Sequence, residues 1–433
     1  MRVIDWKASS ETEKESALAR PEAIANSDIV DAVRDIMREV KVRGDAALND
    51  YTAKFDGANL ETIQVPFKEL ESAWNALDDK DKAAIEVARS NIKKFHQAQT
   101  PKDISIETMK GVTCSREARA IKTAGLYVPG GTAPLVSTLL MLAVPAKVAG
   151  VRNRIIVTPP DKNGNINPAI LAAAYRCKVS AVYACGGAQA IAALAYGTET
   201  IPKCDKIFGP GNAWVATAKS LAAQEPGGPA IDLPAGPSEA MVLADENANP
   251  EFVASDLLSQ AEHDTLAQVV CVATHQDVAE KIQTAVATQV KTLPRRDIAE
   301  KALSFARMVI AKDRADVVDI VNRYAPEHLI IQMKKPETLV PAIQNAGSIF
   351  LGPWTPESVG DYASGTNHTL PTYGAARAYS GVTLESFIKY ISVQKLSKKG
   401  LKNLGPTVER LATLEELEAH KRAVSLRLEA LND

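Results

Sequence analysis

Between residues 124 and 224, short apolar runs alternate with segments that have the length and spacing of helices. Each run ends in a turn rich in glycine or proline, and a helical segment follows it. The four units begin with the runs AGLYVPGG, RIIVTPP, VSAVYACGG and DKIFGPG. Strands that alternate with helices form βαβ crossovers, and continuously apolar strands are typical of sheets covered on both faces. The sequence therefore predicts a buried, mostly parallel sheet.

A second α/β run follows the proline-rich segment 225–237. Its strands are expected in EAMVLAD, QVVCVAT, LIIQM and SIFLG, and its helices at 249–263, 276–291 and 336–346. We expect it to pack with N-terminal helices at 28–43 and about 80–97, which would make the first domain discontinuous. The expected parts are an N-terminal extension (1–24), a first α/β domain (25–125 and 239–380), a second α/β domain (126–238) and a C-terminal tail (381–433).

The tail is polar and lysine-rich, and it ends in an expected helix, 414–431. Thr413 and Glu416 have the spacing of a capping box at the start of this helix. His420 falls on its apolar face, either as a hydrogen-bonded core histidine or as a residue carried into a site on another subunit. An amphipathic helix after a sparse linker has little core of its own, so we expect it to dock on the body or on a partner subunit.

Composition excludes several classes of function. The 433 residues carry a formal charge of −2 without a long lysine and arginine block, which argues against nucleic-acid and membrane-surface binding. No stretch has the apolar length of a membrane span, and the polar start does not resemble a signal peptide. The five cysteines are scattered and form no CxxC pair, which favours a reducing compartment. We expect a cytoplasmic protein.

Three of the turns that follow expected strands are rich in glycine: Pro129-Gly130-Gly131, Gly186-Gly187 and Gly209-Pro210-Gly211. They would lie together at the carboxyl edge of the parallel sheet, where backbone N–H groups can approach a pyrophosphate. Glycines are also common in tight turns without any ligand. GPGNAW keeps two glycines of a dinucleotide fingerprint, but Trp214 occupies the third glycine position. Candidate cofactor contacts beside the turns are Tyr127, Gln189 and Asn212.

Three segments place ionisable or amide side chains where chemistry could use them. Gln260 and His263 are three residues apart on an expected helix, and Asp361 lies in a glycine-rich loop after a strand. One amide oxygen, one carboxylate and one or two imidazoles suit zinc or another divalent first-row ion, although such a helical pair is also compatible with a hydrogen-bonded core edge. Glu327 and His328 directly precede an apolar strand, where ionisable groups are costly unless they are paired or used.

The chain resembles the histidinol dehydrogenase family. The most specific match is IDLPAGPSEAMVLADENANPEFVASDLLSQAEH (231–263), and GLYVPGG, GGAQAIAALAYGTE, KIFGPGN, YAPEHLI, GDYASGTNHTLPT and LSKKG follow the family order. The resemblance implies the last two steps of histidine biosynthesis, in which L-histidinol is oxidised through L-histidinal to L-histidine with two NAD and one water. It also implies an α/β fold with two incomplete, Rossmann-like parallel-sheet domains and small N- and C-terminal helical extensions, assembled as an intertwined homodimer that exchanges its tails.

Carried onto this sequence, the resemblance assigns a role to each candidate residue. One zinc ion per subunit would orient the substrate, and its ligands would be Gln260, His263, Asp361 and the partner subunit's His420. His328 would act as the base for the alcohol and Glu327 would activate the water. Further substrate contacts would be Ser238, His368 and Glu415, beside His328 and the zinc ligands, and the NAD contacts would be Tyr127, Gln189 and Asn212. Two positions depart from the family pattern: Asp264 stands where glycine is expected, and Trp214 stands where tyrosine or phenylalanine is usual.

Three alternatives remain open from the residues. A related zinc- and NAD-dependent dehydrogenase of another small polyol, such as a sulfonated diol, would keep the catalytic core but change the residues that recognise the substrate. Ser238, His368 and Glu415 are all present, which argues against it. A metallohydrolase would use a metal-bound water directly, and the sequence contains no HExxH motif. A non-catalytic binding protein would be expected to lose the adjacent Glu327 and His328.

Overall fold

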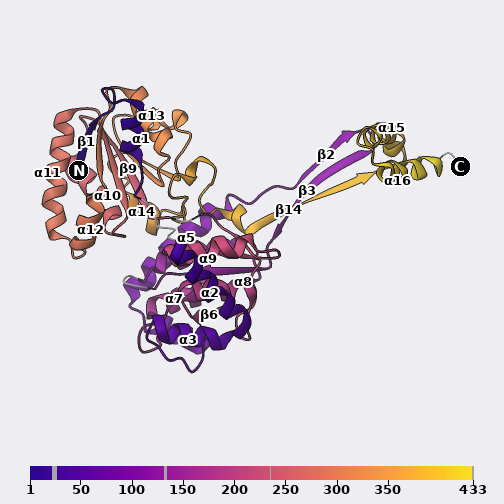
Figure 1. Ribbon diagram of the computed structural model, residues 1–433, viewed down its shortest axis with the longest axis horizontal. Coiled ribbons are helices and arrows are strands. Elements are labelled where there is room, and N and C mark those ends of the chain that lie inside the picture. The colour runs from indigo at the N-terminus through magenta and orange to yellow at the C-terminus, as the bar shows by residue number, and fades with distance from the viewer. Residues whose placement is uncertain (22–26, 131–133, 235, 432–433) are drawn as a thin grey trace. The chain divides into compact units, whose positions relative to one another are not determined.

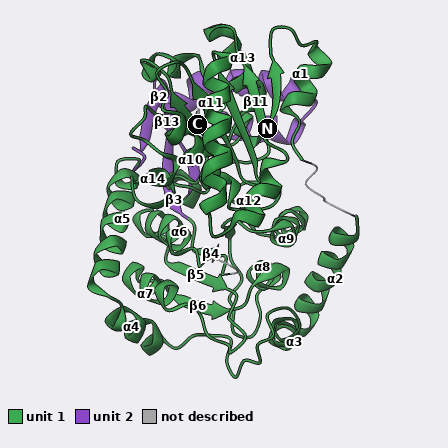
Figure 2. Cartoon of the chain, turned by 90° about the vertical axis from the view of Figure 1, so that its left-hand side faces the viewer, with its two compact units in different colours: residues 1–99, 121–387 green, residues 100–120, 388–433 purple. Residues whose placement is uncertain are grey.

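The computed structural model describes residues 1–21, 27–130, 134–234 and 236–431. These residues form two compact units, which Figure 2 distinguishes by colour. Unit 1 contains residues 1–99 and 121–387, and unit 2 contains residues 100–120 and 388–433. Gly131 and the expected boundary between residues 24 and 25 lie outside the described residues. In the part of the chain that the structure describes, no helix combines the length and apolar character of a membrane span.

Unit 1 contains a five-stranded sheet with the order β6-β5-β4-β7-β8, in which every neighbouring pair is parallel. Its strands are β4 (Thr123–Tyr127), β5 (Asn153–Thr158), β6 (Ala181–Ala184), β7 (Lys206–Phe208) and β8 (Ala230–Ile231). The helices between them are α6 (Val136–Val148), α7 (Pro168–Cys177), α8 (Gly187–Tyr196) and α9 (Ala213–Gln224). The βαβ pattern of the sequence therefore predicted a parallel sheet and four of its strands correctly, but β8 lies in the proline-rich segment that was expected to be a boundary.

A second sheet in unit 1 has six strands in the order β1-β11-β10-β9-β12-β13, and it is also parallel throughout. The strands are β1 (Arg2–Asp5), β9 (Glu239–Ala244), β10 (Gln268–Ala273), β11 (Arg307–Ile310), β12 (His328–Gln332) and β13 (Ser348–Leu351). Its helices are α1 (Glu11–Leu18), α10 (Pro250–Ala261), α11 (Gln276–Gln289), α12 (Arg296–Leu303), α13 (Arg314–Tyr324) and α14 (Glu357–Tyr362). The N-terminal extension, expected to be helical, thus begins with an edge strand.

The helix expected at 336–346 is absent from the described structure of that segment. Pro336–Thr338 and Val340–Ala342 form two single 3₁₀ turns instead. Proline lacks an N–H donor and its ring clashes with the preceding turn, so Pro341, inside the expected helix, prevents a continuous α-helix.

Four N-terminal helices pack differently from the sequence-based expectation. They are α2 (Ser27–Arg43), α3 (Asp45–Phe55), α4 (Phe67–Ala76) and α5 (Asp79–Gln97). Val33, Ile36 and Val40 of α2 share a core with the residues of α8 and the five-stranded sheet, and α4 and α5 contact α7 and α6 (Figure 2). The expectation that the helices at 28–43 and about 80–97 pack with the 239–380 segment was therefore wrong for α2, whereas α5 also reaches that segment through the hydrogen bond from Asn91 to the Ala363 carbonyl at 2.9 Å. An amphipathic pattern identifies the buried face of a helix but not the surface that covers it.

Unit 2 is an antiparallel three-stranded sheet followed by two helices (Figure 1). The strands are β2 (Ile104–Met109), β3 (Val112–Ala120) and β14 (Ile388–Leu396), and the helices are α15 (Lys398–Leu414) and α16 (Glu418–Glu429). The sequence analysis had placed 100–120 in the first α/β domain and expected a sparse linker before a helix at 414–431, but β14 and α15 occupy that part of the tail. The expected capping box is also wrong, because Thr413 lies in the last turn of α15 and donates to the carbonyl of Glu409. Glu416 has a φ of 58°, which interrupts the helix before α16 begins.

Candidate active site

The adjacent residues Glu327 and His328 lie at the amino edge of the six-stranded sheet, where β12 begins. Helix α13 ends at Ala325, whose φ of 55° is left-handed, and Pro326 follows it. This turn brings the chain to the sheet beside β9 and β13, with His328 in register with Ala240 and Ser348. The sharp helix end therefore fixes where the two ionisable residues enter the sheet.

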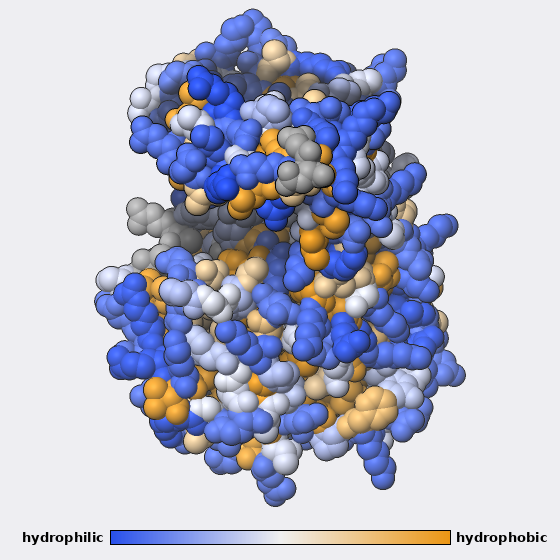
Figure 3. All heavy atoms as spheres, turned by 90° about the vertical axis from the view of Figure 1, so that its right-hand side faces the viewer, coloured by the Kyte–Doolittle hydropathy of each residue, from blue (hydrophilic) through white to orange (hydrophobic). Residues whose placement is uncertain are grey.

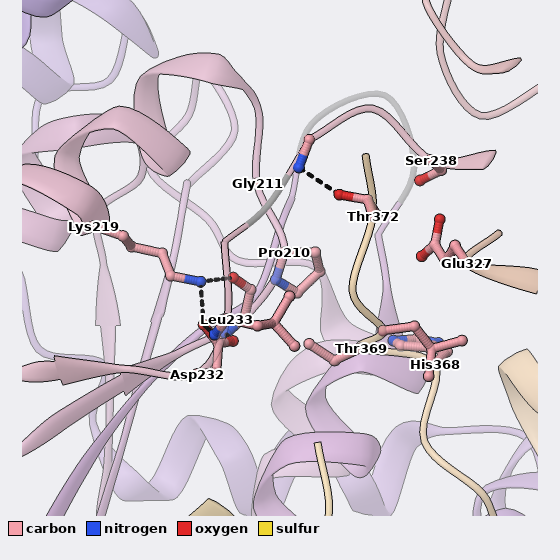
Figure 4. Close-up of a pocket in the computed structure, with 13 residues that line it drawn as sticks. Pro210, Gly211, Lys219, Asp232, Leu233, Ser238, Glu327, His368, Thr369 and Thr372 are labelled. Atoms are coloured by element: carbon pink, nitrogen blue, oxygen red, sulfur yellow. Dashed lines mark hydrogen bonds and ion pairs between the residues drawn. The ribbon is translucent and has the colours of Figure 1, made fainter. Parts of the chain in front are cut away.

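A cavity of about 90 Å³ joins this edge to the carboxyl edge of the five-stranded sheet. One side is formed by the Gly209 turn, Gly209-Pro210-Gly211, which follows β7. The other side includes Ser238, Glu327 and His368 (Figure 4). The fold therefore brings a glycine turn of the kind that approaches phosphates into the same cavity as a buried carboxyl group.

Glu327 is buried, and its Oε2 accepts a hydrogen bond of 2.9 Å from the backbone N–H of Glu239. Burial raises the pKa of Glu327 to about 8, although His328 and the N–H of Glu239 act in the opposite direction. A carboxyl group with such a pKa can exchange a proton near neutral pH.

The imidazole of His328 is surrounded by carboxylates. Its Nδ1 lies 3.3 Å from the carbonyl oxygen of Glu239 and 3.7 Å from Oε1 of Glu357. Its Nε2 lies 3.3 Å from Oδ1 of Asp361. Burial alone would lower the pKa of His328, but Glu357, Glu327 and Asp361 raise it well above its ordinary value. The ring is therefore the basic centre of an acidic cluster.

Glu357 is a site residue that the sequence reasoning missed. It is buried, its Oε1 has no hydrogen-bond partner among the described residues, and burial raises its pKa to about 8. Glu357 and Asp361 are four residues apart on α14, so both carboxylates face His328. This spacing in ESVGDY was the available signal, but the segment was interpreted as a glycine-rich loop.

Oxygen and nitrogen donors for a metal ion gather around Asp361. Gln260 is buried near the end of α10, and its Oε1 lacks a hydrogen-bond partner in the described structure. His263 follows one turn later and is exposed, and α10 packs against α14, which carries Asp361. Among the described residues, the ligand atoms of His328, Glu357 and Asp361 also lie within 4.8 Å of one another. Asp361 is thus common to the expected ligand set and to this cluster.

His368 lines the cavity with its ring already oriented. Its Nδ1 lies 2.9 Å from the carbonyl oxygen of Asp361, and its Nε2 lies 3.0 Å from the hydroxyl of Thr138. Burial lowers the pKa of His368, which favours the neutral ring. The two contacts fix the ring between α14 and α6.

The Gly209 turn is held by a buried ion pair that the sequence reasoning also missed. The Nζ of Lys219 donates to the carbonyl of Gly209 at 2.9 Å and to Asp232, and Asp232 accepts from the N–H of Gly209 at 2.7 Å (Figure 4). Gly209 has a φ of 121°, and a Cβ there would lie 2.1 Å from the carbonyl oxygen of Tyr127. Only glycine fits this close approach.

The expected cofactor residues adjoin these turns. The Tyr127 hydroxyl accepts from the N–H of Gly187 at 3.3 Å, and burial raises its pKa to about 12, so it is neutral. Gln189 is buried in the first turn of α8. Asn212 caps α9, where its Oδ1 accepts from the N–H groups of Trp214 and Val215. Its amide NH₂ is the group it can direct to a ligand.

Glu415 and His420, the expected tail residues of the site, both belong to unit 2 and are exposed. Every residue of α16 is at least partly exposed, so His420 is not a core histidine. Its exposed imidazole can bind a metal ion or contact a substrate.

The two departures from the family pattern have local explanations. Asp264 is exposed, and its Oδ1 accepts from the N–H of Leu266 at 2.8 Å, which caps the turn after α10. The exposed Trp214 lies in the first turn of α9, and its N–H donates to the capping side chain of Asn212.

Comparisons with known proteins identify the family. The family model described as histidinol dehydrogenase matches residues 19–428. Proteins named histidinol dehydrogenase from Vibrio parahaemolyticus and Salmonella typhimurium are 51% and 49% identical over 431 residues, covering 100% of this chain and 99% and 98% of theirs. The crystal structure of histidinol dehydrogenase from Elizabethkingia anophelis has a TM-score of 0.96 and 48% identity, covering 100% of this chain and 99% of that one. As its sequence motifs indicated, the chain belongs to the histidinol dehydrogenase family.

Proposed function

We propose that this oxidoreductase converts L-histidinol through L-histidinal to L-histidine, with one NAD reduced in each step and one water consumed in the second. The observation that carries the proposal is the cavity in which the Gly209 turn meets Glu327, Ser238 and His368. It brings a turn that can approach a pyrophosphate close to buried groups that can handle protons. The family match and the presence of Ser238, His368 and Glu415 do not favour a dehydrogenase of another polyol.

The first step needs a base for the hydroxyl proton while a hydride leaves the carbinol carbon. His328 suits this role because one ring nitrogen faces the Glu239 carbonyl and the other faces the cluster at Asp361. The second step adds water to the aldehyde, and a second hydride leaves the hydrated carbon. Glu327 suits the activation of this water because its buried carboxylate lines the cavity.

Zinc fits the donors at this site. Gln260, His263 and Asp361 would hold it together with the partner subunit's His420, and the unsatisfied Oε1 of Gln260 supports this set. Glu357 and Asp361 face different nitrogens of His328, and His328 would act beside the ion as the base. When bound, the ion would orient the substrate and, by engaging Asp361, weaken the hold of this carboxylate on the His328 proton.

The glycine turns and their neighbours support NAD as the hydride acceptor. The Gly209 turn and the start of α8 both lie at the carboxyl edge of the five-stranded parallel sheet, the usual ligand-binding edge. Tyr127, Gln189 and Asn212 stand beside these turns. NAD would accept the hydride, and the turns would bring its pyrophosphate close to backbone N–H groups.

A homodimer with exchanged tails would explain the surface of unit 2. All residues of β2 are exposed, although a strand exposed on both faces has little to stabilise it. Large apolar side chains are also exposed in unit 2: Ile104, Ile106, Met109, Ile391, Val393, Leu396, Leu411, Leu414, Leu417 and Leu426. Figure 3 shows apolar side chains interrupting the hydrophilic surface. A second copy of the chain would cover these residues, and its tail would supply His420 and Glu415.

Removal of the metal tests the proposed activity. We expect the purified protein to form NADH from L-histidinol and to lose at least about 90% of this rate after dialysis against a chelator, because the metal orients the substrate. Added zinc should restore the rate. The control is the same treatment followed by magnesium, which the histidine-containing ligand set does not favour. Failure to form NADH from histidinol in the presence of zinc would exclude the proposed function.

Gly209→Ala tests the cofactor turn. A Cβ at this position would collide with the Tyr127 carbonyl in a backbone conformation that alanine rarely adopts. We expect KM for NAD to rise roughly 10-fold or more, because even a small displacement of the turn disturbs cofactor placement, while zinc content stays at the wild-type level. The matched control is Gly227→Ala, where φ is also positive but no atom lies within 4 Å of the added Cβ. An unchanged KM for NAD in Gly209→Ala would contradict the placement of the cofactor.

A further inference from the structure

The peptide groups of one residue, Glu239, contact both proposed catalytic side chains. Its N–H donates to Oε2 of Glu327 at 2.9 Å, and its carbonyl oxygen lies 3.3 Å from Nδ1 of His328. Glu327 and His328 approach each other to 3.8 Å around this backbone segment. Any displacement of the Glu239 peptide therefore displaces the carboxylate and the imidazole together.

The side chain of Glu239 is anchored by a buried network. Arg20 donates to both carboxylate oxygens, from Nε at 2.5 Å and from Nη2 at 2.9 Å. The Tyr324 hydroxyl oxygen lies 3.0 Å from Oε2, and the N–H of Gly374 approaches Oε1 at 3.4 Å. With 1% of its surface exposed, Glu239 depends on these donors for the stabilisation of its charge.

Arg20 is itself held in one orientation. Its guanidinium carbon lies 4.0 Å from the centre of the Tyr324 ring, and its Nη2 also donates to the Tyr324 carbonyl at 2.6 Å. The preceding residue, Ala19, accepts from Nε2 of Gln268 at 3.0 Å, and Oε1 of Gln268 accepts from the Tyr324 hydroxyl at 2.8 Å. The network therefore links the segment after α1 to the start of β9.

We propose that Arg20 and Glu239 are a positioning pair, whose bidentate ion pair fixes the Glu239 peptide and thereby aligns Glu327 and His328 for both oxidation steps. The inference rests on the proposed function of these two residues. A purely stabilising role is a weaker explanation, since a buried ion pair often contributes no more to stability than apolar residues of the same volume. The two parallel hydrogen bonds between Arg20 and Glu239 do fix the orientation of the carboxylate, and lysine cannot reproduce this bidentate geometry.

The test compares Arg20→Met, Arg20→Lys and Glu239→Gln with the wild type, using L-histidinol and L-histidinal as separate substrates. The matched control is Arg154→Met. Arg154 is also partly buried, but within the described structure its guanidinium group donates only to the backbone carbonyls of Val151, Arg152 and Lys178 near the five-stranded sheet. Each variant is assayed below the onset of its thermal unfolding, so that loss of folded protein does not enter the rate.

For Arg20→Met we expect kcat to fall roughly 10- to 100-fold with both substrates, because a misplacement of about 1 Å has effects of this size. KM for NAD should stay within about twofold, since the pair does not touch the Gly209 turn. Arg20→Lys should recover part of the loss, and Arg154→Met should keep the wild-type kcat even where its melting temperature falls.

Wild-type kcat in folded Arg20→Met would overturn the proposal. If that variant does not fold, wild-type kcat in both Arg20→Lys and Glu239→Gln overturns the proposal instead. Each of these changes disrupts the bidentate ion pair but roughly preserves side-chain volume. A wild-type protein that forms no NADH from histidinol would instead refute the proposed function, so the two failures are distinguishable.

Discussion

Glu327→Gln is expected to stop the reaction after the first hydride transfer. The amide has the shape of the carboxyl group but cannot accept a proton from water, so the aldehyde step should slow by about 10²- to 10⁴-fold, the usual range for loss of a general base. The alcohol step should fall by no more than about 10-fold, since His328 carries it. In a single-turnover experiment, NADH should approach one equivalent per site instead of two.

His328→Asn provides the comparison for this experiment. Removal of the imidazole takes away the proposed base of the alcohol step and disturbs the carboxylate cluster formed by Glu357 and Asp361. Both oxidation steps should therefore slow. A comparable loss at both steps in Glu327→Gln would contradict the proposed division of labour between the two residues.

The pH dependence of the aldehyde step offers a second measurement on Glu327. Burial raises the pKa of this carboxyl group to about 8, and it acts as a base only when it is deprotonated. The wild-type rate with L-histidinal should therefore rise with pH and level off above about 8. Glu327→Gln should lack this rise, because it has no carboxyl group to titrate.

The sequence predicted the two parallel sheets because a βαβ unit is a local pattern. Each strand and its following helix are read within a short stretch, and the crossover dictates parallel pairing. The three-stranded sheet of unit 2 gave no such signal. Every residue of ISIETM in β2 is exposed within the chain, so no alternation of buried and exposed residues could reveal the strand.

The sequence named several candidate residues of the site, but it missed Glu357 and gave no geometry. Neighbours in a regular strand point to opposite faces, so nothing in the sequence indicated that Glu327 and His328 contact the same peptide. Glu327 precedes the first residue of β12, however, and its carboxylate turns back to the Glu239 peptide, 3.8 Å from His328. Arg20 and Glu239 lie 219 positions apart, so no local pattern could connect them.

Mixing two variants that each fail to form L-histidine is expected to restore about one quarter of the wild-type rate of L-histidine formation if each site uses the tail of the partner subunit. Glu327→Gln removes a proposed site residue that lies in unit 1, and His420→Ala removes one that lies in unit 2. After joint refolding of equal amounts, about half of the dimers are mixed, and one of the two sites in each mixed dimer combines an intact body with an intact tail.

The same experiment separates exchange from a tail that serves its own chain. In that case every site of a mixed dimer contains one defect, and the mixture stays as inactive as its components. Refolding each variant alone controls for recovery of active protein, and light scattering establishes that dimers form. Because His420 is exposed on a helix that has no buried residue, we expect recovery of about one quarter of the wild-type rate.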